Sequence, residues 1–166
     1  MRRFEKAIPG AGEMQEILSQ ATVGYLGLCD EGNPYVVPLN FVYLDGRIYF
    51  HGAAQGRKIE ILQRNQRPRV FFVATESKGF GVAESPCKIG SRYRCVMASG
   101  WARRVTDEGE KLRALTALLG KCVPDGGYRP LTPEMVDGYR SRLGSLTAVV
   151  AIEVEEMTGK RDGWED

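Results

Sequence analysis

The sequence predicts a mainly β fold: a small antiparallel β-barrel, closed or nearly closed, with peripheral helices. Six strand-like segments follow one another in an order rich in hairpin turns, and helical segments are inserted late in the chain. This order argues against a doubly wound parallel sheet, whereas barrel closure removes exposed sheet edges. The 166 residues fit one domain, residues 1–166.

The first half of the chain predicts a short helix followed by a three-stranded meander. Apolar residues at helical spacing mark 13–20 as the helix. Turn residues at 30–33 and the pair Asp45-Gly46 separate the strands that follow. Those strands are expected over 22–29, 34–44 and 47–51. One face of the second strand carries apolar residues at every other position: Tyr35, Val37, Leu39, Phe41 and Tyr43.

The second half predicts helices between longer strands. An apolar run over 69–75 predicts a strand buried on both faces. The segment 76–90 contains three glycines and a proline, and it predicts a long loop of the kind that serves as a lid or binding loop. Further strands are expected over 91–105 and 145–157. The expected helices extend over about 55–65, from the Asp107–Glu110 start signature to Gly120, and from Thr132-Pro133 to about Leu143.

Charge balance and cysteine usage narrow the classes of function. With 23 Lys and Arg against 21 Asp and Glu, the chain lacks the basic excess of nucleic-acid-binding proteins. No stretch reaches the apolar length of a membrane span, and the first residues lack the apolar run of a signal peptide, so we expect a cytoplasmic protein. The four cysteines form no Cys-x-x-Cys pair and His51 is the sole histidine, so we expect free thiols and no metal site.

The segment from His51 to Lys58 has the features of a phosphate-binding site. A strand ends at His51, small or flexible residues follow, and Arg57 and Lys58 open a helix. Backbone amides at a helix N-terminus carry partial positive charge, and small residues let an anion approach them. Arg57 offers a bidentate grip and Lys58 a compact charge. The alternative is that both cations are solvated surface charges.

Pro38 marks a break in the second strand. A proline there removes one donor from the hydrogen-bond ladder and leaves backbone groups able to meet the polar rim of a flat heteroaromatic ligand. The alternative is a proline that protects an edge strand from aggregation.

Six short motifs occur in order along most of the chain, with residues 106–144 less distinctive. They are Val37-Pro38-Leu39-Asn40-Phe41, Asp45-Gly46, Tyr49-Phe50-His51-Gly52-Ala53, Gly56-Arg57-Lys58, the segment 93–100 and the segment 157–161. Together they resemble the nitroimidazole-resistance (Nim) family, within the wider group similar to pyridoxamine phosphate oxidase.

The resemblance implies a split β-barrel of the FMN-binding type that forms a homodimer with flavin sites at its interface. It places FMN along the strand 36–41 and the phosphate near Arg57 and Lys58, and it makes His51 the expected catalytic residue. The expected cofactor-binding residues are Val37, Pro38, Leu39, Asn40, His51, Gly52, Ala53, Gly56, Arg57, Lys58 and Trp101. The chain lacks the basic strand and the Arg-Leu tail of true pyridoxamine phosphate oxidases, so vitamin B6 oxidation is not expected.

The leading hypothesis is an FMN-dependent reductase of small molecules such as nitroimidazoles. NAD(P)H is a candidate reductant, although the chain has no G-x-G-x-x-G fingerprint. Two alternatives stay open. One is a module that stores or senses flavin without turnover, and the other is a related barrel that binds haem through His51.

Overall fold

The computed structural model describes residues 3–65, 67–140 and 144–164. Within these residues the strands form one sheet in the order β3-β2-β6-β7-β8-β5-β4, and β1 pairs with β8. The strands are β1 (Ala7–Ile8), β2 (Val23–Asp30), β3 (Asn33–Asn40), β4 (Val42–Leu44), β5 (Arg47–Ala53), β6 (Arg69–Phe80), β7 (Ser91–Arg104) and β8 (Thr147–Asp162). The helices are α1 (Ala11–Gln20), α2 (Arg57–Gln63), α3 (Glu108–Cys122) and α4 (Pro133–Asp137), with 3-10 turns at Phe4–Lys6 and Pro86–Lys88.

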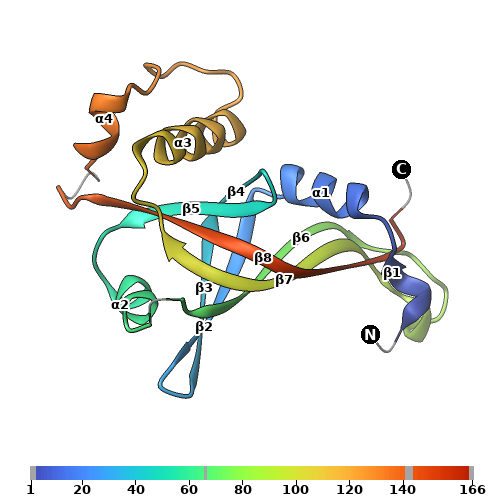
Figure 1. Cartoon of the computed structure of the whole chain (residues 1–166). Coiled ribbons are helices and arrows are strands. Elements are labelled where there is room, and N and C mark those ends of the chain that lie inside the picture. Colours follow the sequence, from blue (N-terminus) through green and yellow to red (C-terminus); the bar gives the residue numbers. More distant parts are fainter. Residues whose placement is uncertain (1–2, 66, 141–143, 165–166) are drawn as a thin grey trace.

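The two outermost strands of the sheet are neighbours in the chain. β3 and β4 stand at opposite ends of the strand order, yet Phe41 alone joins them. The sheet therefore curls until its ends meet, with β3 close to β5. Every strand pair is antiparallel. The result is the split β-barrel that the sequence predicts (Figure 1).

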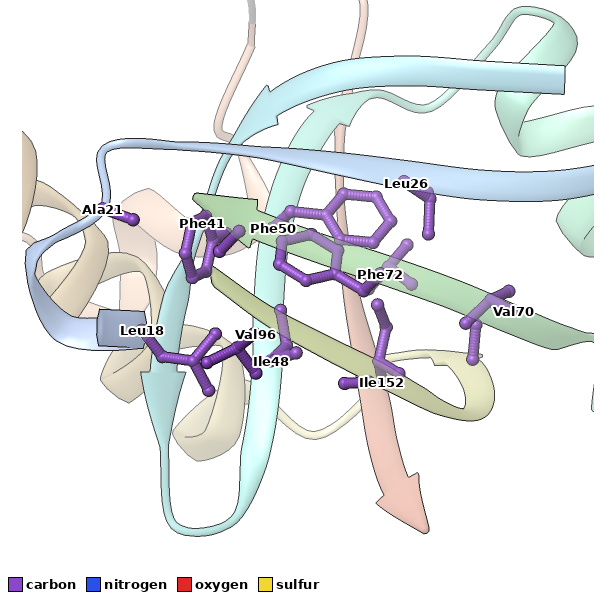
Figure 2. Packing of buried hydrophobic residues seen from close by; sticks show 14 of the residues in the cluster. Leu18, Ala21, Leu26, Phe41, Ile48, Phe50, Val70, Phe72, Val96 and Ile152 are labelled. Carbon is purple, nitrogen blue, oxygen red and sulfur yellow. The ribbon is translucent and has the colours of Figure 1, made fainter. Parts of the chain in front are cut away.

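The barrel interior is filled by aromatic and branched side chains from most of its strands. Phe41, Phe50 and Phe72 are among the largest fully buried side chains, and they gather with Leu26 in the centre of the barrel (Figure 2). The rings of Phe41 and Phe72 meet edge to face, with 4.9 Å between centroids. This is a favourable geometry for an aromatic pair. Because alternate side chains of a strand point to opposite faces, one face of each strand supplies this core.

Two helices pack on the barrel, each against a different apolar cluster. α1 buries Met14, Ile17 and Leu18 in the interior core. α3 buries an apolar stripe against the outer face of β4, β5 and β8, where Tyr49 and Val149 lie (Figure 1). The middle of β5 is therefore apolar on both faces. Among the described residues, no helix has both the length and the apolarity needed to cross a bilayer.

The expected strand 34–44 is wrong as a single element. The structure divides it into β3 and β4, because the chain turns at Phe41 and buries that ring in the core. The expected loop 76–90 is also too long, since β6 continues to Phe80 and pairs with β7 up to that point. The irregular part of this connection is 81–90, with one 3-10 turn inside it.

Three other boundaries differ from the sequence-based expectations. Gly120 does not end α3, which continues to Cys122 with its last carbonyls still bonded in helical fashion. The helix expected to reach Leu143 ends at Asp137 as α4, and residues 141–143 lie outside the described residues. β8 extends to Asp162, five residues past the apolar alternation, because its polar end pairs with β1 and β7.

Candidate functional site

The candidate site lies where β5 ends and α2 begins. His51, Gly52 and Ala53 are the last residues of β5. Gly56 caps α2 with φ 102° and ψ 164°, a backbone conformation that favours glycine. Its carbonyl accepts hydrogen bonds from the amides of Ile59 and Glu60. No side chain caps the start of α2, so the contiguous group from His51 to Lys58 presents mostly backbone and two cations.

Lys58 is a half-buried cation without an acidic partner among the described residues. Its side chain is half-buried, and its ammonium lies 5.3 Å from the centroid of the Phe50 ring and 3.2 Å from the place a Cβ of residue 52 would occupy. Burial lowers the pKa of this ammonium. Lys58 makes no ion pair with any residue that the structure describes. A partly desolvated cation without a counter-charge is a ready partner for an anion.

Arg57 is exposed but already has an acidic partner. Its Nε donates a hydrogen bond to Asp30 at 2.9 Å, and its guanidinium stacks 4.5 Å from the centroid of the Tyr35 ring. Arg64 pairs with the same carboxylate. Hydrogen bonding by Arg57, and next by Arg64, lowers the pKa of Asp30. Arg57 is therefore an exposed cation that is held by an ion pair with Asp30 and by the ring of Tyr35.

His51 faces away from the barrel interior at the end of β5. Its side chain is exposed, whereas the neighbouring Phe50 points into the core. Partial removal of the imidazole from water, and next the charge of Lys58, lower the pKa of His51. The ring is therefore neutral near pH 7, because the ordinary histidine pKa already lies below that value.

The four predicted residues of β3 fall on two faces. Val37 and Leu39 are half-buried and pack against the barrel core, whereas Pro38 and Asn40 are exposed on the outer face. The Asn40 side-chain amide donates to the Thr22 carbonyl at 3.0 Å. β3 stands at one end of the strand order, a position in which a proline is tolerated because one side of the strand has no ladder partner. Because β3 lies close to β5 across the split, these residues and the group from His51 to Lys58 lie on neighbouring segments.

Trp101 is not adjacent to that group within one chain. It lies in β7, which β8 separates from β5, and β2 and β6 separate it from β3. Its indole N–H donates to Glu155 at 2.5 Å, and the guanidinium groups of Arg67 and Arg69 lie 5.7 and 5.3 Å from the centroid of its ring. Trp101 therefore contacts charged side chains on the outer face of the barrel.

Sequence reasoning missed the acidic partner and the ring that hold Arg57. Asp30 was expected only as a turn residue, and Tyr35 only as a packing residue. The contact joins positions 27 residues apart along the chain. No local pattern signals such a pair, because its distance depends on how the β2–β3 hairpin lies against α2.

A partly open cavity of about 210 Å³ lies on another side of α2. It is lined by residues of α2, β7 and β8, and neither His51 nor Lys58 borders it. The cavity and the group from His51 to Lys58 are therefore separate features.

The outer face of β3, β2 and β6 exposes a patch of apolar side chains. Val36, Tyr25 and Phe71 are 59%, 43% and 48% exposed. Pairing places Pro38 opposite Tyr25, and it places both Val36 and Phe71 opposite Gly27. These residues therefore form a continuous patch. Exposed apolar patches of this kind mark surfaces that bind another molecule.

Comparison with known proteins identifies related sequences and folds. The family model described as pyridoxamine 5′-phosphate oxidase matches residues 11–161. No curated protein matches the sequence. A solved structure of a proposed 5-nitroimidazole antibiotic resistance protein from Bacteroides thetaiotaomicron is 31% identical and has a TM-score of 0.70. The match covers 93% of this chain and 85% of that one.

Two more distant structures share the fold. The flavocytochrome Anf3 from Azotobacter vinelandii is 22% identical, with a TM-score of 0.78 over 100% of this chain and 75% of that one. A FAD- and haem-binding protein from Mycobacterium smegmatis is 20% identical, with a TM-score of 0.77 over 97% of this chain and 76% of that one.

Proposed function

This chain belongs to the pyridoxamine 5′-phosphate oxidase family, and from that membership we propose that it binds FMN and reduces small molecules. Proteins with this fold include ones described as binding FAD or haem, and the 31% identical relative is described as a proposed resistance protein for 5-nitroimidazoles. Nitro compounds of that class are therefore the proposed substrates, and NAD(P)H the proposed reductant.

The observation that carries the proposal is the half-buried ammonium of Lys58. A charge in this position disfavours folding unless an anion meets it, and no described acidic side chain does so. The phosphate of FMN supplies such an anion. Gly52, Ala53 and Gly56 leave the surrounding backbone open to close approach. The outward side chains of β3, across the split, offer a wall for the ring of the ligand.

The residues of the site have separate roles in this proposal. Lys58 and Arg57 hold the phosphate, and His51 keeps a neutral ring that can accept a proton at one ring nitrogen and pass it to a bound substrate. A bound flavin supplies hydride or single-electron transfer, and the protein supplies its placement. A neutral imidazole also suits haem ligation, which keeps haem binding as the second candidate function.

A homodimer is part of the proposal. The exposed apolar patch of Val36, Pro38, Tyr25 and Phe71 includes the outward residues of the strand proposed to face the ring. A second copy seated on this patch would exclude water from it and would narrow the space beside β3.

The test is a titration of the purified protein with FMN and with riboflavin, which lacks the phosphate. The double variant Arg57→Ala/Lys58→Ala is expected to lose about tenfold or more in FMN affinity and little in riboflavin affinity. Unchanged FMN affinity would refute the phosphate assignment. A visible spectrum that bleaches with NAD(P)H supports a reductase, one that stays yellow favours a flavin store or sensor, and a Soret band favours haem.

A further inference from the structure

One carboxylate ties the tip of the β2–β3 hairpin to both ends of α2. Asp30, the last residue of β2, accepts a hydrogen bond from Arg57, the first residue of α2. It also pairs with Arg64, the residue that follows the last turn of α2. The Asp30 side chain is 14% exposed, whereas that of Arg57 is 55% exposed. Asp30 is thus the mostly buried partner, whereas Arg57 is accessible to a ligand.

We propose that Asp30 is a positioning residue that fixes Arg57 for the phosphate of the bound flavin. The inference rests on the proposed function, because it concerns the same anion. The Asp30 carboxylate engages the Nε of Arg57, while Nη1 and Nη2 make no hydrogen bond within the described part of the chain. The pair of Nη groups is the edge with which a guanidinium grips two phosphate oxygens.

Tyr35 contacts one face of the Arg57 guanidinium and so restricts its orientation. Its ring lies 4.5 Å from the Arg57 Cζ, so the plane of the cation is held on one face while Asp30 holds one edge. A side chain that is already ordered loses less conformational freedom when a ligand binds. The two contacts therefore prepare Arg57 for binding before the anion arrives.

Arg64 keeps Asp30 from cancelling the charge of Arg57. The carboxylate is shared between two guanidinium groups, so the three side chains together keep a net positive charge. Glu31 also pairs with Arg64 at 3.4 Å, but its side chain is 80% exposed, so solvent screens its charge. The phosphate therefore meets an arginine whose charge is only partly compensated.

The same contact sets the spacing between the two halves of the flavin site. Asp30 stands opposite Asn33 across a tight turn, in which Glu31 and Gly32 have φ 53° and 88°. β3, the strand proposed to face the ring, starts directly after this turn. Fixing Asp30 to α2 therefore fixes the start of β3 relative to the phosphate-binding residues.

The test compares Asp30→Asn with Glu31→Gln, a matched loss of one charge in the same turn. Full-length variants are titrated with FMN and riboflavin, with quenching of flavin fluorescence as the signal. Asp30→Asn is expected to weaken FMN binding about tenfold and riboflavin binding less than about twofold, and Glu31→Gln to change neither. Unchanged or tighter FMN binding by Asp30→Asn, or an equal loss for riboflavin, would overturn the inference.

A second comparison asks whether Asp30 acts through Arg57. In an Arg57→Ala background, Asp30→Asn is expected to cause no further loss of FMN affinity, and an equal loss in both backgrounds would overturn the inference. Arg57→Lys, a surface change that keeps the charge but removes the Nε contact, is expected to match Asp30→Asn. Wild-type affinity in that variant would also count against the inference. Failure of the wild-type protein to bind FMN would contradict both the proposed function and the inference. Normal wild-type binding together with unchanged FMN affinity in Asp30→Asn would contradict the inference alone.

Discussion

The ammonium of Lys58 lies 3.2 Å from the position that a Cβ atom of Gly52 would take. A side chain at position 52 would therefore compete with the ammonium for the same space. The cation is accommodated by the absence of a side chain at this position, and no acidic partner among the described residues neutralises it. The charge of Lys58 is therefore expected to favour the binding of an anion and to disfavour folding.

Lys58→Met is expected to raise stability and lower FMN affinity. Burial lowers the pKa of Lys58, so its charge costs free energy in the folded state, and an apolar replacement should add about 0.5–1 kcal/mol to the free energy of unfolding. FMN affinity should fall about tenfold. Urea denaturation and a flavin titration measure the two effects. Lys88→Met, an exposed lysine in the 81–90 loop, should change neither. A less stable Lys58→Met protein would contradict the prediction.

FMN affinity is expected to fall as pH rises through the lowered pKa of Lys58. A phosphate beside Lys58 favours the protonated form of its amine, so the complex takes up protons when it forms. Below about pH 6 the phosphate itself gains a proton, which also weakens binding. Calorimetry in buffers of different ionisation enthalpy measures the uptake. Riboflavin should show no such linkage, and equal proton uptake by both ligands would contradict the prediction.

Lys121 is expected to make stability depend on pH above neutrality. Its ammonium donates to the Leu18 carbonyl at 2.8 Å and lies 3.8 Å from the centroid of the Phe41 ring, and burial lowers its pKa to about 8. An unfolded lysine keeps its proton up to about pH 10.4. Between these values the unfolded chain holds more protons, so the contribution of Lys121 to stability grows as pH rises.

Lys121→Met should therefore remove that rise. Thermal unfolding between pH 7.5 and 10 is expected to show the wild-type protein gaining stability relative to the variant, with Lys88→Met as the control. A difference that stays constant across this range would show that Lys121 titrates at its ordinary pKa in the folded protein.

Two glycine-to-alanine changes are expected to act in opposite directions. A Cβ at Gly24 would lie 2.0 Å from the end of the buried Phe72 ring, so Gly24→Ala should lower the free energy of unfolding by about 1–3 kcal/mol. A Cβ at Gly120, in the last turns of α3, would meet nothing within 4 Å. Gly120→Ala should therefore add about 0.5–1 kcal/mol. Chemical denaturation measures the free energy of unfolding of both variants. A destabilised Gly120→Ala protein would mean that α3 does not extend through this position.

The proposed dimer is expected to depend on the apolar patch of β3, β2 and β6. Phe71→Lys should raise the dimer dissociation constant at least about tenfold, because it places a charge where a partner would exclude water. Light scattering coupled to size exclusion measures the change. Val82→Lys is the control, since Val82 is fully exposed in the loop 81–90. Equal dissociation of both variants, or a monomeric wild-type protein, would contradict the prediction.

The β-barrel could be predicted from sequence because its strands carry strong local signals. Alternation from Tyr35 to Leu39 and the Asp45-Gly46 turn both correspond to observed elements. The break at Phe41 could not be predicted, because alternation continues through it and only the packing of Phe41 against Phe72 bends the chain there. The polar end of β8 was missed because its partners, β1 and β7, decide that it is a strand.

The site was predictable as a segment but not as a set of contacts. The succession of a strand end, small residues and two cations is visible along the chain, and the structure keeps His51 to Lys58 contiguous. Only the three-dimensional structure shows how the two cations differ. Arg57 has Asp30 as a partner, whereas Lys58 has no acidic partner among the described residues. The sequence treats these adjacent cations alike, and the fold gives them different environments.

β8 is the strand that unites the sheet, since it pairs with β1, β5 and β7. It also follows β5 and β7 in the chain and so leaves the ribosome after them. Until residues 147–162 emerge, β5 and β7 have no shared neighbour, and the hairpins that contain them can form only as separate units. Before β8 emerges, the nascent chain exposes unpaired edges of β5 and β7, and such edges favour aggregation. Changes within β8 should therefore reduce the yield of folded protein in cells more than their effect on the finished barrel would imply.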